Sequence, residues 1–203
     1  ATVVTDVGQH QMWEAQYYHH NRRRSLLTSG GLGTMGYSLP AAIGAQIGRP
    51  DEEIWVVAGD GGFQMTMSEL STVAQERLPI KIAIINNNAL GMVRQWQSLF
   101  YEGRYSNTDL MTESLPNFPK LAEAMGCVGL RATNEVEMEA AIQQALEIND
   151  RPVVVEFVVH KDAMVWPMVP AGVSNDEIRV ARDMAPDVVL LDLGLPIVTG
   201  LDV

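Results

Sequence analysis

One stretch of the sequence limits the possible folds more than any other: residues 54–88, in which two short apolar runs flank a helical pattern. Ile54–Ala58 and Ile80–Ile85 are rich in β-branched residues, which is typical of buried parallel strands. Between them apolar residues recur at helical period, and Thr66 and Glu69 have the spacing of a capping box. The stretch therefore predicts a strand–helix–strand unit with a right-handed crossover and a helix capped by Thr66.

Polar residues and glycines follow both predicted strands. Asp60 comes directly after the first strand among Gly59, Gly61 and Gly62, and asparagines 86–88 follow the second strand. Because parallel strands end at the same edge of a sheet, we expect these side chains to meet where open α/β sheets bind ligands. A carboxylate and an amide oxygen among exposed backbone amides suit Mg²⁺ bridged to a diphosphate. The alternative is an ordinary turn in which Asp60 caps a helix.

The rest of the chain alternates between predicted strands and helices, without an internal repeat. Strands are expected at 1–5, 128–132 and 152–160, and helices from residue 9, at 38–47 and 89–106, at 117–126 and at 134–148, the last capped by Asn134. This alternation predicts an α/β fold over residues 1–185, with a doubly wound, mostly parallel sheet and helices on both faces.

Two further segments are candidates for ligand contacts. Four glycines at 30, 31, 33 and 36 form a loop that brings backbone close to a ligand, but their spacing does not match a nicotinamide-dinucleotide fingerprint. Gln9 and His10 lie at a strand-to-helix junction, where side chains can reach a phosphate; the alternative is that His10 caps the helix. His19, His20 and Arg22–Arg24 are interpreted as a solvated loop, because no further metal ligands lie at suitable spacing.

Charge and composition exclude several classes of partner. With 14 basic and 25 acidic residues the net charge is −11, which argues against a nucleic-acid or anionic-membrane surface. Hydrophobic residues make up 47% of the chain, enough for a substantial core, and no apolar run has transmembrane length. The one cysteine, Cys127, fits a reducing compartment, so we expect a cytoplasmic location.

Several blocks of the sequence resemble one family of enzymes. The pairing of GDG with a later NN is similar to the thiamine-diphosphate fingerprint, and the blocks that resemble the carboxy-terminal cofactor domain of the acetohydroxyacid (acetolactate) synthase large subunit are TDVGQHQMW, SGGLGTMGY, LPAAIGAQ, GDGGFQM, LGMVRQWQ and FPKLAEAMG. The resemblance implies a thiamine-diphosphate-dependent transferase. By the resemblance, the enzyme would condense pyruvate with pyruvate or 2-ketobutyrate in the biosynthesis of branched-chain amino acids.

The resemblance also implies which residues hold the cofactor. Asp60 and Asn87 would ligate Mg²⁺ through their side chains and Ala89 through its backbone carbonyl, within the fingerprint that Gly59, Gly61 and Gly62 complete. Gln9, His10, Gly91 and Met92 would hold the diphosphate, while Gly33 and Met35 would meet the aminopyrimidine, with the Met35 side chain between the two rings of the cofactor. Trp96 would face the substrate channel; the alternative is a core position.

Other parts of such an enzyme are expected from outside these residues. By the resemblance, the catalytic glutamate belongs to an amino-terminal domain of a neighbouring subunit, so no catalytic residue is assigned here. FAD belongs to a middle domain, and the whole enzyme is a homo-oligomer with a regulatory small subunit as a further partner. The isolated chain is therefore expected to be inactive. The alternatives are a stand-alone thiamine-diphosphate-binding or interaction module, and a domain of another thiamine-diphosphate carboligase or decarboxylase.

The last residues, 186–203, depart from this family. They resemble the phosphoacceptor strand and loop of a response-regulator receiver domain, in which Asp192 would be the phosphorylated aspartate. A receiver also needs an acidic pair, a Thr or Ser and a Lys from segments that these residues do not supply. We therefore interpret 186–203 as a non-functional fragment rather than an independent domain, the alternative being a working receiver.

Overall fold

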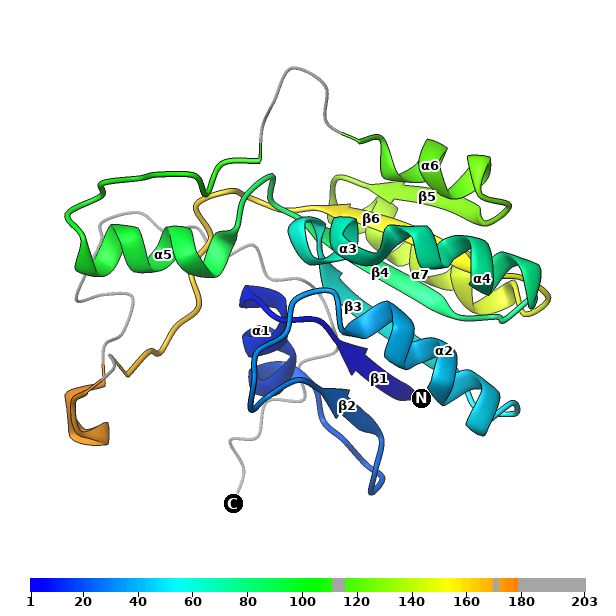
Figure 1. Ribbon diagram of the computed structural model, residues 1–203, viewed down its shortest axis with the longest axis horizontal. Helices are drawn as coiled ribbons and strands as arrows, with labels where there is room; N and C mark the ends of the chain where they lie inside the picture. The colour runs from blue at the N-terminus through cyan, green and yellow to red at the C-terminus, as the bar shows by residue number, and fades with distance from the viewer. Residues whose placement is uncertain (111–115, 170–171, 179–203) are drawn as a thin grey trace.

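The computed structural model describes residues 1–110, 116–169 and 172–178, so that the receiver-like segment with Asp192 lies outside the described residues. Its strands form one parallel sheet in the order β2–β1–β3–β4–β6–β5 (Figure 1). The strands are β1 (Thr2–Thr5), β2 (Leu26–Thr28), β3 (Ile54–Gly59), β4 (Lys81–Asn86), β5 (Val128–Ala132) and β6 (Val153–Val158). Every pairing in this sheet is parallel, as the alternating sequence predicts.

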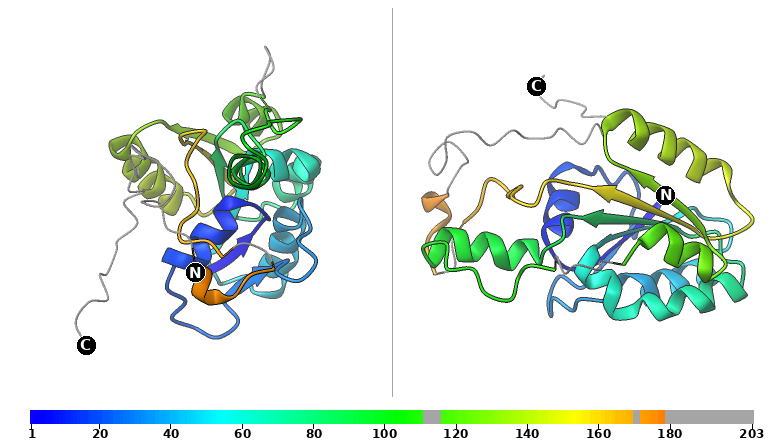
Figure 2. Two further views of the ribbon diagram at one scale, coloured as in Figure 1. Left: turned by 90° about the vertical axis from the view of Figure 1, so that its left-hand side faces the viewer. Right: turned by 90° about the horizontal axis from the view of Figure 1, so that it is seen from above.

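Helices cover both faces of the sheet, which confirms the expected α/β architecture (Figure 2). They are α1 (Gln9–Tyr17), α2 (Ser38–Gly48), α3 (Asp60–Thr66), α4 (Leu70–Gln75), α5 (Gly91–Phe100), α6 (Phe118–Ala124) and α7 (Glu135–Glu147), with short 3₁₀ turns at Met67–Glu69 and Asn175–Glu177. On one face α2, α3, α4 and α6 pack on the strands, and Phe63 and Phe118 meet edge to face at 5.7 Å between ring centroids. On the other face α7 buries Met138, Ala141 and Ala145 against β6 and its neighbours.

The order of the strands creates a switch point between β1 and β3. From β1 the chain continues through α1 to β2 on one side, whereas from β3 it continues through α3 and α4 to β4 on the other side. The loops after β1 and β3 therefore diverge and leave a crevice at the carboxyl ends of these two strands. Asp60 is the first helical residue after β3, and Gln9 and His10 begin the helix after β1, so both segments border this crevice.

Of the two helix caps that the sequence predicts, the structure contradicts one and confirms the other. The prediction that Thr66 caps the helix after β3 is wrong, because α3 already begins at Asp60 and Thr66 Oγ1 donates to Gly36 O at 3.1 Å. The glycine loop offers a carbonyl to that hydroxyl, and this tertiary contact overrides the local capping pattern. The cap at Asn134 is confirmed, since its side chain accepts a hydrogen bond from Glu137 N at 3.0 Å.

Helix α5 stands apart from the layers, beyond the end of the sheet (Figure 1). It is shorter than the helical pattern at 89–106 predicts, ending at Phe100. Gln95 is its one buried residue, whereas Val93, Trp96 and Phe100 are each more than a third exposed. Within the described residues, no helix is long and apolar enough to cross a bilayer.

Close packing between α6 and β5 leads to a prediction about stability. A Cβ added at Gly129 would lie 2.3 Å from Pro119 O and 2.7 Å from Pro119 Cα, both of them backbone atoms that cannot rotate away. We expect Gly129→Ala to lower the free energy of unfolding by about 1–3 kcal/mol, measured by urea denaturation. Gly44→Ala is the control, because its Cβ would enter open space in α2 and is expected to raise stability by about 0.5–1 kcal/mol. Equal effects of the two substitutions would contradict the packing argument.

Candidate functional site

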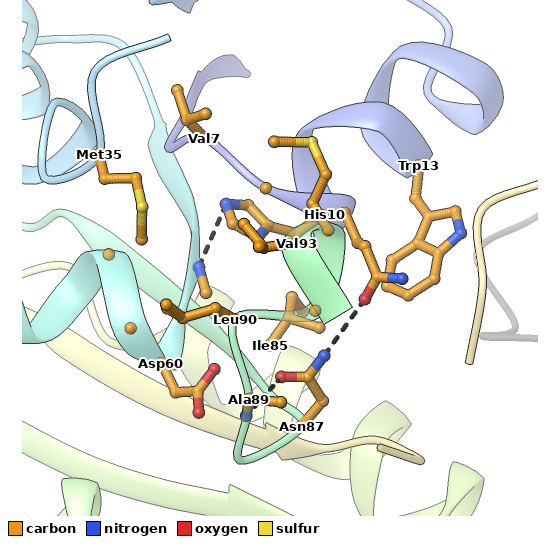
Figure 3. Close-up of a pocket in the computed structure, with 17 residues that line it drawn as sticks. Val7, His10, Trp13, Met35, Asp60, Ile85, Asn87, Ala89, Leu90 and Val93 are labelled. Carbon is orange, nitrogen blue, oxygen red and sulfur yellow. Dashed lines mark hydrogen bonds between the residues drawn. The ribbon is translucent and has the colours of Figure 1, made fainter. Parts of the chain in front are cut away.

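A pocket of about 460 Å³, part of it open to solvent, lies at the switch point between β1 and β3 (Figure 3). Its walls come from the segments that follow β1, β3 and β4, together with Met35 of the glycine loop. The sequence-predicted site residues that line it are Gln9, His10, Met35, Gly59, Asp60, Gly61, Gly62, Asn87, Ala89, Gly91 and Met92. Gly33 and Trp96 are not among the lining residues. The fold thus brings together side chains from three separate strand ends.

Among the lining residues, Asp60 has the clearest features of a ligand-binding group. Its residue is 2% exposed, and Oδ2 has no hydrogen-bond partner among the described residues. Burial raises the pKa of its carboxyl to about 6, against the opposing effect of nearby backbone amides such as those of Gly61 and Asn88. A buried carboxylate without a partner is costly, and a cation beside Oδ2 would remove that cost.

The turn after β4 is fixed by its own asparagines. Asn86 Nδ2 donates to Glu156 Oε1 at 2.6 Å, and Asn86 Oδ1 accepts from Asn88 N at 2.9 Å. Asn88 has φ of 56°, a left-handed conformation that asparagine tolerates better than most residues. Asn87 Oδ1 in turn accepts from Ala89 N at 3.1 Å, so its oxygen faces the side on which Asp60 lies (Figure 3). A carboxylate, an amide oxygen and a tight turn thus adjoin one another.

His10 is a neutral ring that supports the backbone of the pocket. Burial lowers the pKa of its imidazole to about 4, although the Asp6 carboxylate opposes the shift. Nε2 accepts a hydrogen bond from Gly59 N at 3.2 Å, so the neutral ring carries its proton on Nδ1. A Cβ at Gly8 or Gly59 would lie 2.7 or 2.9 Å from His10 Cε1, which explains the two glycines. The helix-capping alternative is wrong, since His10 lies inside α1, whose N-cap is Gly8.

Backbone amides at the starts of two helices supply hydrogen-bond donors to the pocket. Helices α1 and α5 both begin at its wall, and the first amides of a helix have no acceptor within that helix. The described residues that line the pocket include no lysine or arginine. At Gly91, the first residue of α5, a Cβ would come within 2.0 Å of Gln9 Oε1 and 2.4 Å of Asn87 Nδ2. Only a residue without a side chain fits there.

The glycine loop is attached to the pocket by Asp6, a residue that sequence reasoning missed. Its fully buried carboxylate accepts hydrogen bonds from Gly36 N at 2.9 Å and from Ser38 N and Oγ at 3.0 and 2.8 Å. These bonds fix the chain on the C-terminal side of Met35, whose side chain reaches the pocket (Figure 3). The one feature of the sequence that could have identified Asp6 is its position just after an apolar strand and before Gly8.

The donor set fits a divalent cation that shares its coordination with a ligand. Among the described residues, no three His, Cys, Asp or Glu side chains gather into a metal cage. Mg²⁺ rarely needs such a cage, because it is usually held by one or two carboxylates together with phosphate oxygens. Asp60, with the amide oxygen of Asn87 and the backbone of Ala89 nearby, fits that pattern. Trp96 is 38% exposed on α5, which does not support the core alternative.

Comparisons with known proteins agree on one family. Residues 6–157 match the family described as "Thiamine pyrophosphate enzyme, C-terminal TPP binding domain". The chain is 59% identical over 188 residues to the acetolactate synthase of Mycobacterium leprae and to the acetolactate synthase large subunit of Corynebacterium glutamicum, which covers 92% of the chain and 30% of each relative. It is 47% identical to the acetolactate synthase isozyme 2 large subunit of Escherichia coli, over 86% of the chain and 31% of that protein. The chain therefore spans about a third of the relatives it matches.

Proposed function

The chain belongs to the thiamine pyrophosphate enzymes, as a C-terminal TPP-binding domain, and we propose that it serves as this domain in an acetolactate synthase large subunit. The whole enzyme would condense pyruvate with pyruvate or 2-ketobutyrate in branched-chain amino acid biosynthesis. The similarity to acetolactate synthases over 92% of the chain supports the choice of this member of the family. FAD, a homo-oligomeric assembly, a regulatory small subunit and a cytoplasmic location belong to the same proposal.

The observation that carries the proposal is the buried, unpartnered Oδ2 of Asp60 beside the turn that holds Asn87 and Ala89. We propose that these three residues hold Mg²⁺, and that the cation neutralises the diphosphate of the cofactor. The amides at the start of α5, which Gly91 leaves accessible, would face the same diphosphate. With no lysine or arginine among the described lining residues, the cation and the amides share this task.

The other residues of the pocket would orient the cofactor and exclude water. Thiamine diphosphate, when bound, supplies the carbanion chemistry that joins two keto acids. Apolar side chains of Val7, Ile85, Leu90 and Val93 line the pocket and would keep its interior dry. Met35, on the loop that Asp6 secures, would orient the rings of the cofactor. His10 is neutral, so its contribution is to hold Gly59 in position rather than to add charge.

A chimeric enzyme tests the proposed activity. The segment of the Corynebacterium glutamicum large subunit that matches this chain is replaced by the corresponding residues of the chain, which are 59% identical. We expect the chimera to form acetolactate from pyruvate, because the replacement preserves the cofactor pocket. We expect the same chimera carrying Asp60→Ala to lose at least about 100-fold in rate through loss of the cation ligand.

The parent enzyme and the unsubstituted chimera are assayed side by side, with cofactor binding followed by calorimetry. A folded chimera that binds thiamine diphosphate and Mg²⁺ yet forms no acetolactate would contradict the assignment to acetolactate synthase. A folded chimera that does not bind the cofactor would contradict the proposed site itself.

A further inference from the structure

Gln95 occupies an unusual place for a polar side chain. It is 2% exposed, whereas its neighbours on α5 face solvent or a partly open surface. Leaving either end of a buried amide without a hydrogen bond costs free energy, so the partners of Gln95 show what the residue does. Neither its helix nor its sequence neighbours require a glutamine there.

The backbone of Val165 determines which way the Gln95 amide points. Gln95 Nε2 donates to Val165 O at 2.9 Å, and Gln95 Oε1 accepts from Val165 N, also at 2.9 Å. A backbone N–H can only donate and a carbonyl can only accept, so the side chain fits in one orientation. The segment after β6 thereby fixes the polarity of a side chain on α5.

The orientation of the Gln95 amide in turn determines the orientation of the Gln9 amide, at the wall of the pocket. Gln9 Nε2 donates to Gln95 Oε1 at 2.9 Å and to Ala163 O at 2.8 Å, which uses both of its hydrogens. The opposite end of the amide, Oε1, is left to accept from Asn87 Nδ2 at 3.2 Å. Gln9 is 4% exposed, and a reversed amide would set its oxygen against two acceptors.

Asn87 is the last member of this series. Its nitrogen faces Gln9 and its oxygen faces Ala89 N, on the side of Asp60 (Figure 3). The two ends of an asparagine amide have nearly the same shape, but only the oxygen can ligate a hard cation. An asparagine at a metal site therefore needs a neighbour that selects the correct end.

We propose that Gln95 is a positioning residue for the cation site, acting through Gln9 to keep the oxygen of Asn87 turned toward Asp60. The inference rests on the proposed function, since it takes Asn87 as a ligand of the divalent cation. Outer partners of a metal ligand commonly change metal affinity by about 10–100-fold when they are removed. The hydrogen bonds that connect Val165, Gln95, Gln9 and Asn87 form a relay of four residues.

The test compares Gln95→Met with Gln46→Met in the full chain. Gln46 is equally buried at 2%, and its Nε2 donates to Arg49 O, Pro50 O and Glu52 O, near the start of β3 and away from the pocket. Methionine preserves side-chain length in both variants and removes the amide. With thiamine diphosphate in excess, Mg²⁺ is titrated by calorimetry. Trp13, which lines the pocket, gives a fluorescence signal for cofactor binding.

We expect Gln95→Met to raise the apparent Kd for Mg²⁺ by about 10–100-fold, and Gln46→Met to leave it within about twofold. Thermal unfolding of both variants reports their loss of stability, which a purely structural role would share. An unchanged Kd in Gln95→Met, or an equal rise in both variants, would overturn the proposal.

A second measurement does not need the cofactor. In the free chain, the side-chain amide protons of Asn87 are assigned by NMR and their exchange with solvent is measured. We expect exchange to become at least about tenfold faster in Gln95→Met but not in Gln46→Met, with strand amides of β4 still protected. Unchanged exchange would overturn the positioning role. Failure of the wild-type chain to bind Mg²⁺ and cofactor would instead refute the proposed function, and the exchange result would still decide the relay.

Discussion

Replacement of Asp60 by alanine is expected to abolish Mg²⁺-dependent binding of thiamine diphosphate, with an affinity loss of at least about 100-fold by calorimetry. Asp60 is the one buried carboxylate in the pocket wall, and its Oδ2 has no partner among the described residues. The loss should equal that caused by removing Mg²⁺ with a chelator, because both changes remove the same neutralising contact. Equal affinity with and without Mg²⁺ in the wild-type chain would refute the role of Asp60.

Replacement of the Asp60 carboxylate by a neutral amide is expected to have the opposite effect on stability. Burial raises the pKa of Asp60 to about 6, so the folded chain binds this proton more tightly than the unfolded chain does. The charged form therefore lowers the free energy of unfolding at pH 7, by an amount on the order of 2–3 kcal/mol, and that cost is relieved as the pH falls through about 6 toward 4. We expect unliganded Asp60→Asn to be more stable than wild type at pH 7, with the difference vanishing near pH 4.

Substitution of Gly91 by alanine is the second change expected to have a large effect. The new Cβ would lie 2.0 Å from Gln9 Oε1 and 2.4 Å from Asn87 Nδ2, so one or both amides must turn away. Because the Asn87 amide is a proposed ligand of the cation and the Gln9 amide holds it in place, we expect the apparent Kd for thiamine diphosphate to rise by about 10–100-fold. Stability should fall as well, because the displaced amides lose the buried hydrogen bond between Asn87 Nδ2 and Gln9 Oε1.

Gly31→Ala is the matched control for Gly91→Ala. Gly31 belongs to the glycine loop, but a Cβ added there would meet no atom within 4 Å. We expect its calorimetric affinity for thiamine diphosphate to stay within about twofold of the wild type. A similar loss of affinity in both variants would show that any added methyl group in these loops disturbs the pocket, and would contradict the specific clash at Gly91.

The parts that depend on local pattern could be predicted from the sequence. The apolar run Ile80–Ile85 corresponds to β4, and Asp60 lies just after β3, as expected. Both could be predicted because a buried strand is recognisable as a short run of apolar residues that ends at polar residues and glycines. The strand order could not be predicted, since placing β6 between β4 and β5 depends on packing of segments far apart in sequence. The capping pattern at Thr66 failed for the same reason, a contact with Gly36.

The site was predictable in its members but not in their connections. Asp60, Asn87 and Gly91 carry recognisable motifs, and the fold brings them to one pocket. Gln9 and Gln95 are 86 residues apart, and nothing in the pattern around Gln95 distinguishes it from an ordinary helical glutamine. Its burial arises only when the segment at Val165 covers it. Residue types indicate candidate ligands, whereas the groups that orient those side chains depend on tertiary contacts.

The scarcity of cationic side chains in the pocket affects how such a domain would respond to its surroundings. With a net charge of −11 and no lysine or arginine among the described lining residues, the chain repels a bare diphosphate within about a Debye length, roughly 8 Å at physiological ionic strength. A diphosphate already paired with a divalent cation is much less affected by this repulsion. Under the proposed function, occupancy would depend on the product of the cation and cofactor concentrations. Depletion of magnesium in a cell would then empty the pocket even at a high cofactor concentration.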